Sequence, residues 1–251
     1  MWYVLQTVTG KEEGLVQMIK ELVSPNLYTD CFVIYYERIW RKQQQSIVHV
    51  ERLFPGYVFV VSENPAELYQ ELKHVPAMSR FITGEDFEFL PIEKEEEAFF
   101  QELLAADRVV RLSYVETNGK ECVYRVAGPL KTFMSQVVKY QFKKRYALVR
   151  ITLLGKEKTI ALGIILKEDV QQEIAYGKVE KPVTVPKVYE VEKVDSEELL
   201  SVGDHVKVIS GALENMTGVI WKVKKTTVEI GIHLFGQDMP MEVPVEAVCR
   251  V

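Results

Sequence analysis

The chain has 251 residues, 27% of them charged, and a formal net charge of −5. This length allows two or three small domains, and no apolar run approaches the roughly 20 residues that span a bilayer. No charged-then-apolar signal peptide opens the chain, so no membrane association is expected. The acidic balance argues against a protein that coats nucleic acid over its whole surface.

The cysteines predict no special chemistry. Cys31, Cys122 and Cys249 are far apart, odd in number and without paired spacing. We expect neither a disulfide framework nor a zinc site, and this cysteine usage is typical of a reducing cytoplasm. No metal or other cofactor is expected.

The first 106 residues predict an open-faced α+β domain. Helices are indicated by apolar residues at helical spacing and by capping residues, and strands by β-branched and aromatic content. The expected strands cover residues 2–7, 31–40, 47–53, 57–61 and 79–82, and the expected helices start near residues 9–12, 64 and 93. The third helix should run from Glu93 to Asp107, with its acidic start at the positive end of the helix dipole.

The central feature of this domain is the run from Arg52 to Val61. Pro55 cannot donate to a sheet ladder and Gly56 permits backbone angles closed to other residues, so the chain should turn between two strands here. Phe54 and Tyr57 bracket that turn. They could form an exposed aromatic pair, although aromatics beside such a turn also occur in cores.

An internal repeat marks the second half of the chain. Gly128-Pro129-Leu130-Lys131 and Gly211-Ala212-Leu213-Glu214 each head a segment of short alternating strands. This pattern predicts two small β-barrels, at residues 109–167 and 201–251. Residues 168–200 contain prolines among alternating polar and apolar residues and should form an extended linker, with a strand at a barrel edge as the alternative. Independent motion of the two barrels is our hypothesis.

Basic residues gather in the first barrel. From Arg125 to Lys158 there are nine basic residues and one acidic residue, whereas the second barrel has five basic and six acidic residues. Tyr140, Phe142 and Tyr146 interleave with the basic run, which combines stacking surfaces with phosphate partners. We expect RNA binding here by Lys131, Lys139, Lys143, Lys144, Arg145, Arg150, Lys156 and Lys158. A solvated lysine-rich hairpin is the simpler alternative.

Motifs of catalysis are missing from the sequence. It has no phosphate-binding loop with its lysine, no nucleophile elbow and no His-Glu-x-x-His. The four histidines stand in unrelated local contexts. We therefore expect no catalytic residue and no enzyme.

The start of the first strand, the Phe-Pro-Gly-Tyr run at residues 54–57 and the glycine-containing β-modules together resemble the NusG family of transcription elongation factors. The resemblance covers nearly the whole chain and implies an NGN-type open-faced α/β sandwich followed by two KOW-type β-barrels. It implies a monomer whose apolar sheet face binds the clamp helices of RNA polymerase. The residues it assigns directly to that contact are Phe54, Pro55 and Tyr57, and Trp2 and Tyr3 belong to the same contact but are expected nearer the core. Five basic residues are expected near the non-template DNA strand: Lys11, Arg38, Arg41, Lys42 and Arg80.

The basic first barrel is similar to specialised antiterminators of this family such as LoaP, which read a structured leader RNA. We therefore expect a factor that binds polymerase and promotes processive antitermination through contacts with nascent or leader RNA. Two alternatives stay open. One is a ribosome-associated RNA-binding protein that works through its KOW modules, and the other is the housekeeping member of the family.

Overall fold

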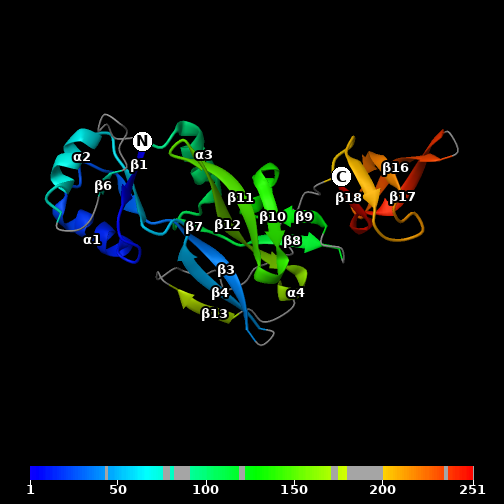
Figure 1. Cartoon of the computed structure of the whole chain (residues 1–251), viewed down its shortest axis with the longest axis horizontal. Helices are drawn as coiled ribbons and strands as arrows, with labels where there is room; N and C mark the ends of the chain where they lie inside the picture. Colours follow the sequence, from blue (N-terminus) through cyan, green and yellow to red (C-terminus); the bar gives the residue numbers. More distant parts are fainter. Residues whose placement is uncertain are drawn as a thin grey trace.

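The structure is a computed structural model and describes residues 1–42, 45–75, 80–81, 91–118, 122–170, 175–179, 200–234 and 237–250. Helices and sheets combine into the expected mixed α+β fold. Figure 1 shows the N-terminal helices at one end of the long axis, the central sheets in the middle and the C-terminal sheet at the other end.

The N-terminal sheet is covered on both faces. Its strands lie in the order β2 (Asp30–Phe32), β5 (Tyr57–Val61), β1 (Trp2–Gln6) and β6 (Arg80–Phe81). Successive side chains of a strand point to opposite faces. Tyr3 and Leu5 therefore pack with α1 (Glu12–Leu22) and α2 (Pro65–Leu72), while Trp2 and Val4 enter a second core on the other face.

The predicted strand over residues 31–40 is two strands. After β2 the chain passes Val33 and Ile34 and continues as β3 (Tyr35–Lys42), which pairs with β4 (Gln45–Arg52). Val33 lies in the core under α1 and Ile34 in the opposite core, so the break lets the chain leave the first sheet and enter another. That second sheet has the order β13 (Ala175–Val179), β4, β3 and β7 (Val109–Val110).

A five-stranded sheet follows, which we call the central β-domain (residues 113–166). Its order is β10 (Val137–Gln141), β11 (Tyr146–Leu153), β12 (Lys156–Leu166), β8 (Ser113–Thr117) and β9 (Val123–Ala127). Short 3-10 turns connect the strands: η1 (Pro129–Lys131), η2 (Met134–Gln136) and η3 (Phe142–Lys144). A short helix, α4 (Lys167–Val170), comes next.

The central β-domain shares one hydrophobic core with the N-terminal domain. That core joins aromatic residues of the first sheet to Phe100 of α3 (Lys94–Leu103) and to Leu130, Phe133 and Val149 of the central β-domain. A boundary near residue 106 therefore separates the two in sequence but not in packing. The first predicted barrel does not stand apart from the N-terminal domain.

Residues 200–250 form the C-terminal β-domain. Its strands lie in the order β17 (Gln237–Pro244), β16 (Thr227–Leu234), β15 (Thr217–Val223), β14 (His205–Val208) and β18 (Val248–Arg250), with the turn η5 (Val245–Ala247) before the last strand. The two halves of the predicted repeat are alike in part. Gly128 and Gly211 have φ angles of 86° and 92°, and each precedes three consecutive antiparallel strands.

The expectation about the cysteines is wrong. Cys122 and Cys249 form a disulfide across 127 positions of sequence, whereas Cys31 is free and buried. The two residues meet because β9 and β18 lie against each other, which their spacing in sequence cannot reveal. Of the predicted linker, residues 168–170 belong to α4 and residues 175–179 to β13. β13 is a strand, but it pairs in parallel with β4 of the second sheet and not with the edge of a predicted barrel. The prolines of the linker, at residues 182 and 186, lie outside the described residues.

Candidate functional site

The turn at Pro55-Gly56 is held by a buried carboxylate. Glu12, at the start of α1, is fully buried and accepts hydrogen bonds from the backbone N–H groups of Gly10 and Gly56, both at 2.7 Å. Arg52 lies 3.2 Å from the same carboxylate. Gly56 has a φ of 84°, and a Cβ there would lie 3.0 Å from the Thr7 carbonyl oxygen. The turn therefore requires glycine and has one fixed conformation.

Phe54 points into the shared core. Its side chain is 6% exposed and its ring lies 5.8 Å from Phe59 and 5.7 Å from Phe100, measured between centroids. Trp2 and Tyr3 are both 4% exposed. In this arrangement these three predicted contact residues are core residues, and the central β-domain covers the face on which Trp2 and Phe54 lie.

Pro55 and Tyr57 stay at the surface. Pro55 is exposed and Tyr57 is half-buried. Lys158 of β12 donates a hydrogen bond to the Tyr57 hydroxyl at 3.0 Å, and its ammonium lies 4.6 Å from the centre of the Tyr57 ring. Lys158, which the sequence places in the RNA-binding set, therefore connects the central β-domain to the aromatic turn.

A second carboxylate fastens the central β-domain to α3. Glu96 is 5% exposed and accepts hydrogen bonds from the backbone N–H groups of Leu154 and Gly155, each at 3.1 Å. Nearby, the rings of Phe99 and Phe133 lie 4.3 Å apart. A polar clamp and an aromatic contact thus hold the β11–β12 turn and η1–η2 segment on α3.

The three consecutive basic residues after Phe142 have different environments. Lys143 and Lys144 of η3 are exposed, whereas Arg145 is 2% exposed. The Arg145 guanidinium lies 2.6 Å from the Asp169 carboxylate and also contacts Glu168 and the Phe142 carbonyl oxygen. Arg145 therefore forms buried ion pairs within the protein. Its assignment to the RNA-binding set was wrong, because its guanidinium is not exposed to bind a phosphate.

The other predicted RNA-binding residues are spread over the central β-domain. Lys139 and Lys156 are exposed, while Lys131 in η1 is half-buried. Arg150 lies 3.4 Å from Glu157 and lines a groove of about 650 Å³ that also contains Glu95 and Glu96. The two ends of β11, near η3 and near Lys156, are about 23 Å apart at 3.3 Å per residue. One small RNA contact cannot include them all.

The aromatic residues of the basic run do not offer free stacking faces. Tyr140 and Phe142 stack on each other at 5.3 Å and pack against the shared core. Burial raises the pKa of Tyr140 to about 12, so its hydroxyl stays protonated. Tyr146 lies beneath the Arg38 guanidinium, 5.4 Å from its ring centre.

An exposed tryptophan was not among the predicted site residues. Trp40 of β3 is 51% exposed, with the Arg38 guanidinium 5.9 Å and the His49 ring 4.9 Å from its ring centre. Because Arg38 also covers Tyr146, β3 lies beside the end of η3. We call Arg38, Trp40, Lys143 and Lys144 the basic face. In the sequence, Trp40 directly precedes Arg41 and Lys42, and this combination of an aromatic residue with basic residues could have indicated a nucleic-acid contact.

The residues expected near DNA are separated by the fold. Arg38 belongs to the basic face, and Arg41 lies 3.3 Å from Glu168. Lys11 is exposed at the start of α1. Lys42 ends β3 and Arg80 begins β6, but the side chains of both lie outside the described residues.

Two further observations concern site types. Within the ranges that the structure describes, no group of His, Cys, Asp and Glu residues is arranged to hold a metal ion. In the same ranges, no helix is long and apolar enough to cross a membrane.

The fold and the site define a class of multidomain protein. An α+β domain with a fixed aromatic turn carries two β-domains, and the basic face lies where β3 meets η3 of the central β-domain. Residues 1–101 match the family model described as "Transcription termination factor nusG". Over this N-terminal domain the chain is similar to the NusG family, in agreement with the resemblance of its sequence. Proteins of this family are non-enzymatic transcription factors, in agreement with the expected class.

Curated relatives cover most of the chain. It is 25% identical over 185 residues to the transcription termination/antitermination protein NusG of Helicobacter pylori strain J99, which covers 72% of this chain and 97% of that protein. The NusG of Vibrio parahaemolyticus is 26% identical over 186 residues, covering 72% and 94%. A solved structure titled "Domain interaction in Thermotoga maritima NusG" shares 22% identity and covers 100% and 96% of the two chains, with a TM-score of 0.30.

Proposed function

We propose that this chain is a NusG-type elongation factor that binds RNA polymerase and promotes processive antitermination, with RNA contacts of the central β-domain recruiting it. The observation that carries the proposal is the match of residues 1–101 to the NusG family. The curated relatives are named as termination/antitermination proteins, which supports a role in transcription. A factor that bridges the polymerase clamp would stabilise its processive state.

The aromatic turn is the proposed polymerase contact. Because Phe54, Trp2 and Tyr3 are buried, we assign the direct contact in this arrangement to Pro55 and Tyr57, with the buried residues supporting the turn. A polymerase contact with Phe54 itself would require the central β-domain to leave α3.

Tyr57→Ala should weaken binding to a reconstituted elongation complex by about tenfold or more, because aromatic contact residues concentrate binding energy. Binding of the full chain is measured by titration of a labelled complex. Tyr69→Ala is a matched control, since Tyr69 is also half-buried and has a lysine ammonium 4.4 Å from its ring centre. Equal affinities of the two variants would refute the assignment of Tyr57.

The basic face is the proposed nucleic-acid contact. Lys143 and Lys144 present two ammonium groups to solvent, and Trp40 offers a ring on which a base could stack. The Arg38 guanidinium lies close to the rings of both Trp40 and Tyr146 and 3.6 Å from Glu51, so it connects β3 to the start of β11, next to η3. This arrangement supports contact with a single-stranded or looped RNA segment.

Lys143→Glu/Lys144→Glu should reduce RNA affinity and lower the slope of log K against log salt by about 2, because each lost phosphate contact removes about 1. The measurement is a salt titration of binding to a structured leader RNA. Lys222→Glu/Lys225→Glu makes the same charge change at exposed positions of the C-terminal β-domain and serves as the control. An unchanged slope in the first variant would contradict the proposal.

The housekeeping role is the second candidate. It is favoured by the curated relatives, which carry the general name NusG. A housekeeping factor should act on elongation complexes whatever their leader RNA, whereas the proposed specialist should require one. Antitermination assays with and without a candidate leader distinguish the two.

A further inference from the structure

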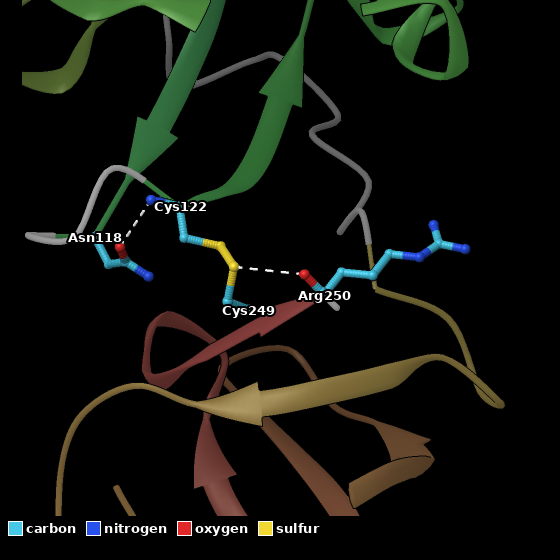
Figure 2. The surroundings of a disulfide bond; sticks show 4 residues. All are labelled: Asn118, Cys122, Cys249 and Arg250. Carbon is cyan, nitrogen blue, oxygen red and sulfur yellow. Dashed lines mark hydrogen bonds between the residues drawn. A yellow bond between two sulfur atoms is a disulfide. The ribbon is translucent and has the colours of Figure 1, made fainter. Parts of the chain in front are cut away.

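The disulfide joins two separate β-domains. Cys122 lies just before β9 of the central β-domain, and Cys249 lies in β18 of the C-terminal β-domain, with a Cα–Cα distance of 6.0 Å. Figure 2 shows the bond crossing from one domain to the other. Asn118 accepts the Cys122 backbone N–H at 3.0 Å and so holds the turn that carries this cysteine.

Beside the disulfide, β9 of the central β-domain lies against β18 of the C-terminal β-domain. Tyr124 of β9 packs against the core of the C-terminal β-domain, and its hydroxyl donates to Glu116 at 2.7 Å. Arg250, next to Cys249, pairs at 3.0 Å with Asp204 of its own domain. The disulfide therefore fixes β9 to β18 at the place where these two strands meet.

The three cysteines differ in their exposure to solvent. Cys122 and Cys249 are partly exposed, whereas Cys31 is 1% exposed, and burial raises its pKa to about 12. A thiolate is the attacking species in disulfide exchange, and exposed disulfides are the reducible ones. Redox chemistry of the native chain should therefore be confined to the Cys122–Cys249 pair.

We propose that Cys122–Cys249 is a redox-controlled tether, which a dithiol reductant opens to release the C-terminal β-domain from the central β-domain. One thiolate of the reductant attacks a sulfur of the pair and forms a mixed disulfide. Its second thiol then displaces the remaining cysteine. Two electrons and two protons pass to the chain, giving two cysteine thiols and an oxidised, disulfide form of the reductant.

The surroundings of Cys249 suit a reduced thiol. The Arg250 carbonyl oxygen lies 3.6 Å from Cys249 Sγ, so a thiol at Cys249 has an acceptor in place (Figure 2). The C-terminal β-domain has its own buried core, formed by Val206, Ile220, Ile230 and neighbouring residues, so we expect it to stay folded after reduction. After reduction it becomes a separately moving module, held near by the chain.

Thiol counting tests the bond in the full chain, purified without reductant. Alkylation after denaturation should give one label, on Cys31, and three labels after full reduction. Dithiothreitol added to the native protein before alkylation should expose Cys122 and Cys249 but not Cys31. Three labels without reduction, or a pair that resists dithiothreitol in the native state, would overturn the proposal.

Backbone amide NMR relaxation tests the tether. In the oxidised chain, amides of β16 and β11 should share one rotational correlation time, and reduction should shorten that of β16 alone. Cys122→Ser and Cys249→Ser should each reproduce the reduced behaviour without reductant, while Cys31→Ala should behave as the unaltered chain. A shared correlation time in both redox states would overturn the release. None of these readouts depends on polymerase or RNA, so they are independent of the proposed function.

Discussion

Replacing Phe54 by alanine is expected to lower the free energy of unfolding by about 3 to 5 kcal/mol. Phe54 is 6% exposed and contacts the rings of Phe59 and Phe100 in the shared core. Removal of the ring leaves a cavity where the N-terminal and central β-domains meet. Urea unfolding of the full chain, followed by tryptophan fluorescence, measures the change.

Val138→Ala is the control for Phe54→Ala. Val138 is an apolar residue of the central β-domain that is 51% exposed, so its replacement should change stability by no more than about 0.5 kcal/mol. A Phe54→Ala variant as stable as the control would show that Phe54 is not a core residue in solution. The prediction also bears on binding studies, because lost polymerase binding by Phe54→Ala could reflect unfolding. Tyr57→Ala is the better probe of the contact.

Arg145→Met should destabilise the protein by about 3 to 5 kcal/mol, because it leaves a buried carboxylate without its partner. Asp169 is 1% exposed, lies 2.6 Å from the Arg145 guanidinium, and also accepts hydrogen bonds from Ser46 and the Leu166 N–H. These bonds hold α4 against β12 and β4. Chemical denaturation at constant salt measures the loss.

Lys144→Met removes an exposed charge from the adjacent position and should leave stability nearly unchanged. The double variant Arg145→Met/Asp169→Asn should recover part of the loss, since it also removes the unpaired negative charge. If Arg145→Met unfolded at the same denaturant concentration as Lys144→Met, the ion pair would not contribute to stability. These variants also separate stability from RNA affinity within one basic run.

Local sequence signals predicted the three helices of the N-terminal domain and most strands, but not the short helix α4. Apolar spacing located α1, α2 and α3, although α3 ends at Leu103 rather than at Asp107. These features could be predicted because turns and short elements depend on neighbouring residues. The break between β2 and β3 was missed because it depends on which of two cores receives each side chain.

The candidate site was predicted as a set of residue types but not as an arrangement. Lys143, Lys144 and Arg145 are alike in sequence, but Arg145 alone is buried. It is paired there with Asp169, which lies 24 positions further along the chain. Trp40 and Arg38 join the basic face because β3 lies beside η3, more than 100 positions along the chain. Such pairings have no local signal.

The sequence by itself indicated the similarity to the NusG family, through the aromatic turn and the strands around it, and it predicted the turn itself, where Gly56 has a φ of 84°. Only the tertiary structure decided that Phe54 is buried, that Arg145 is paired with Asp169 and that Cys122 is bonded to Cys249. The physical reason is the distance in sequence between the residues that determine each property. Backbone conformation follows from adjacent residues, whereas burial and pairing follow from residues that only the folded chain brings together.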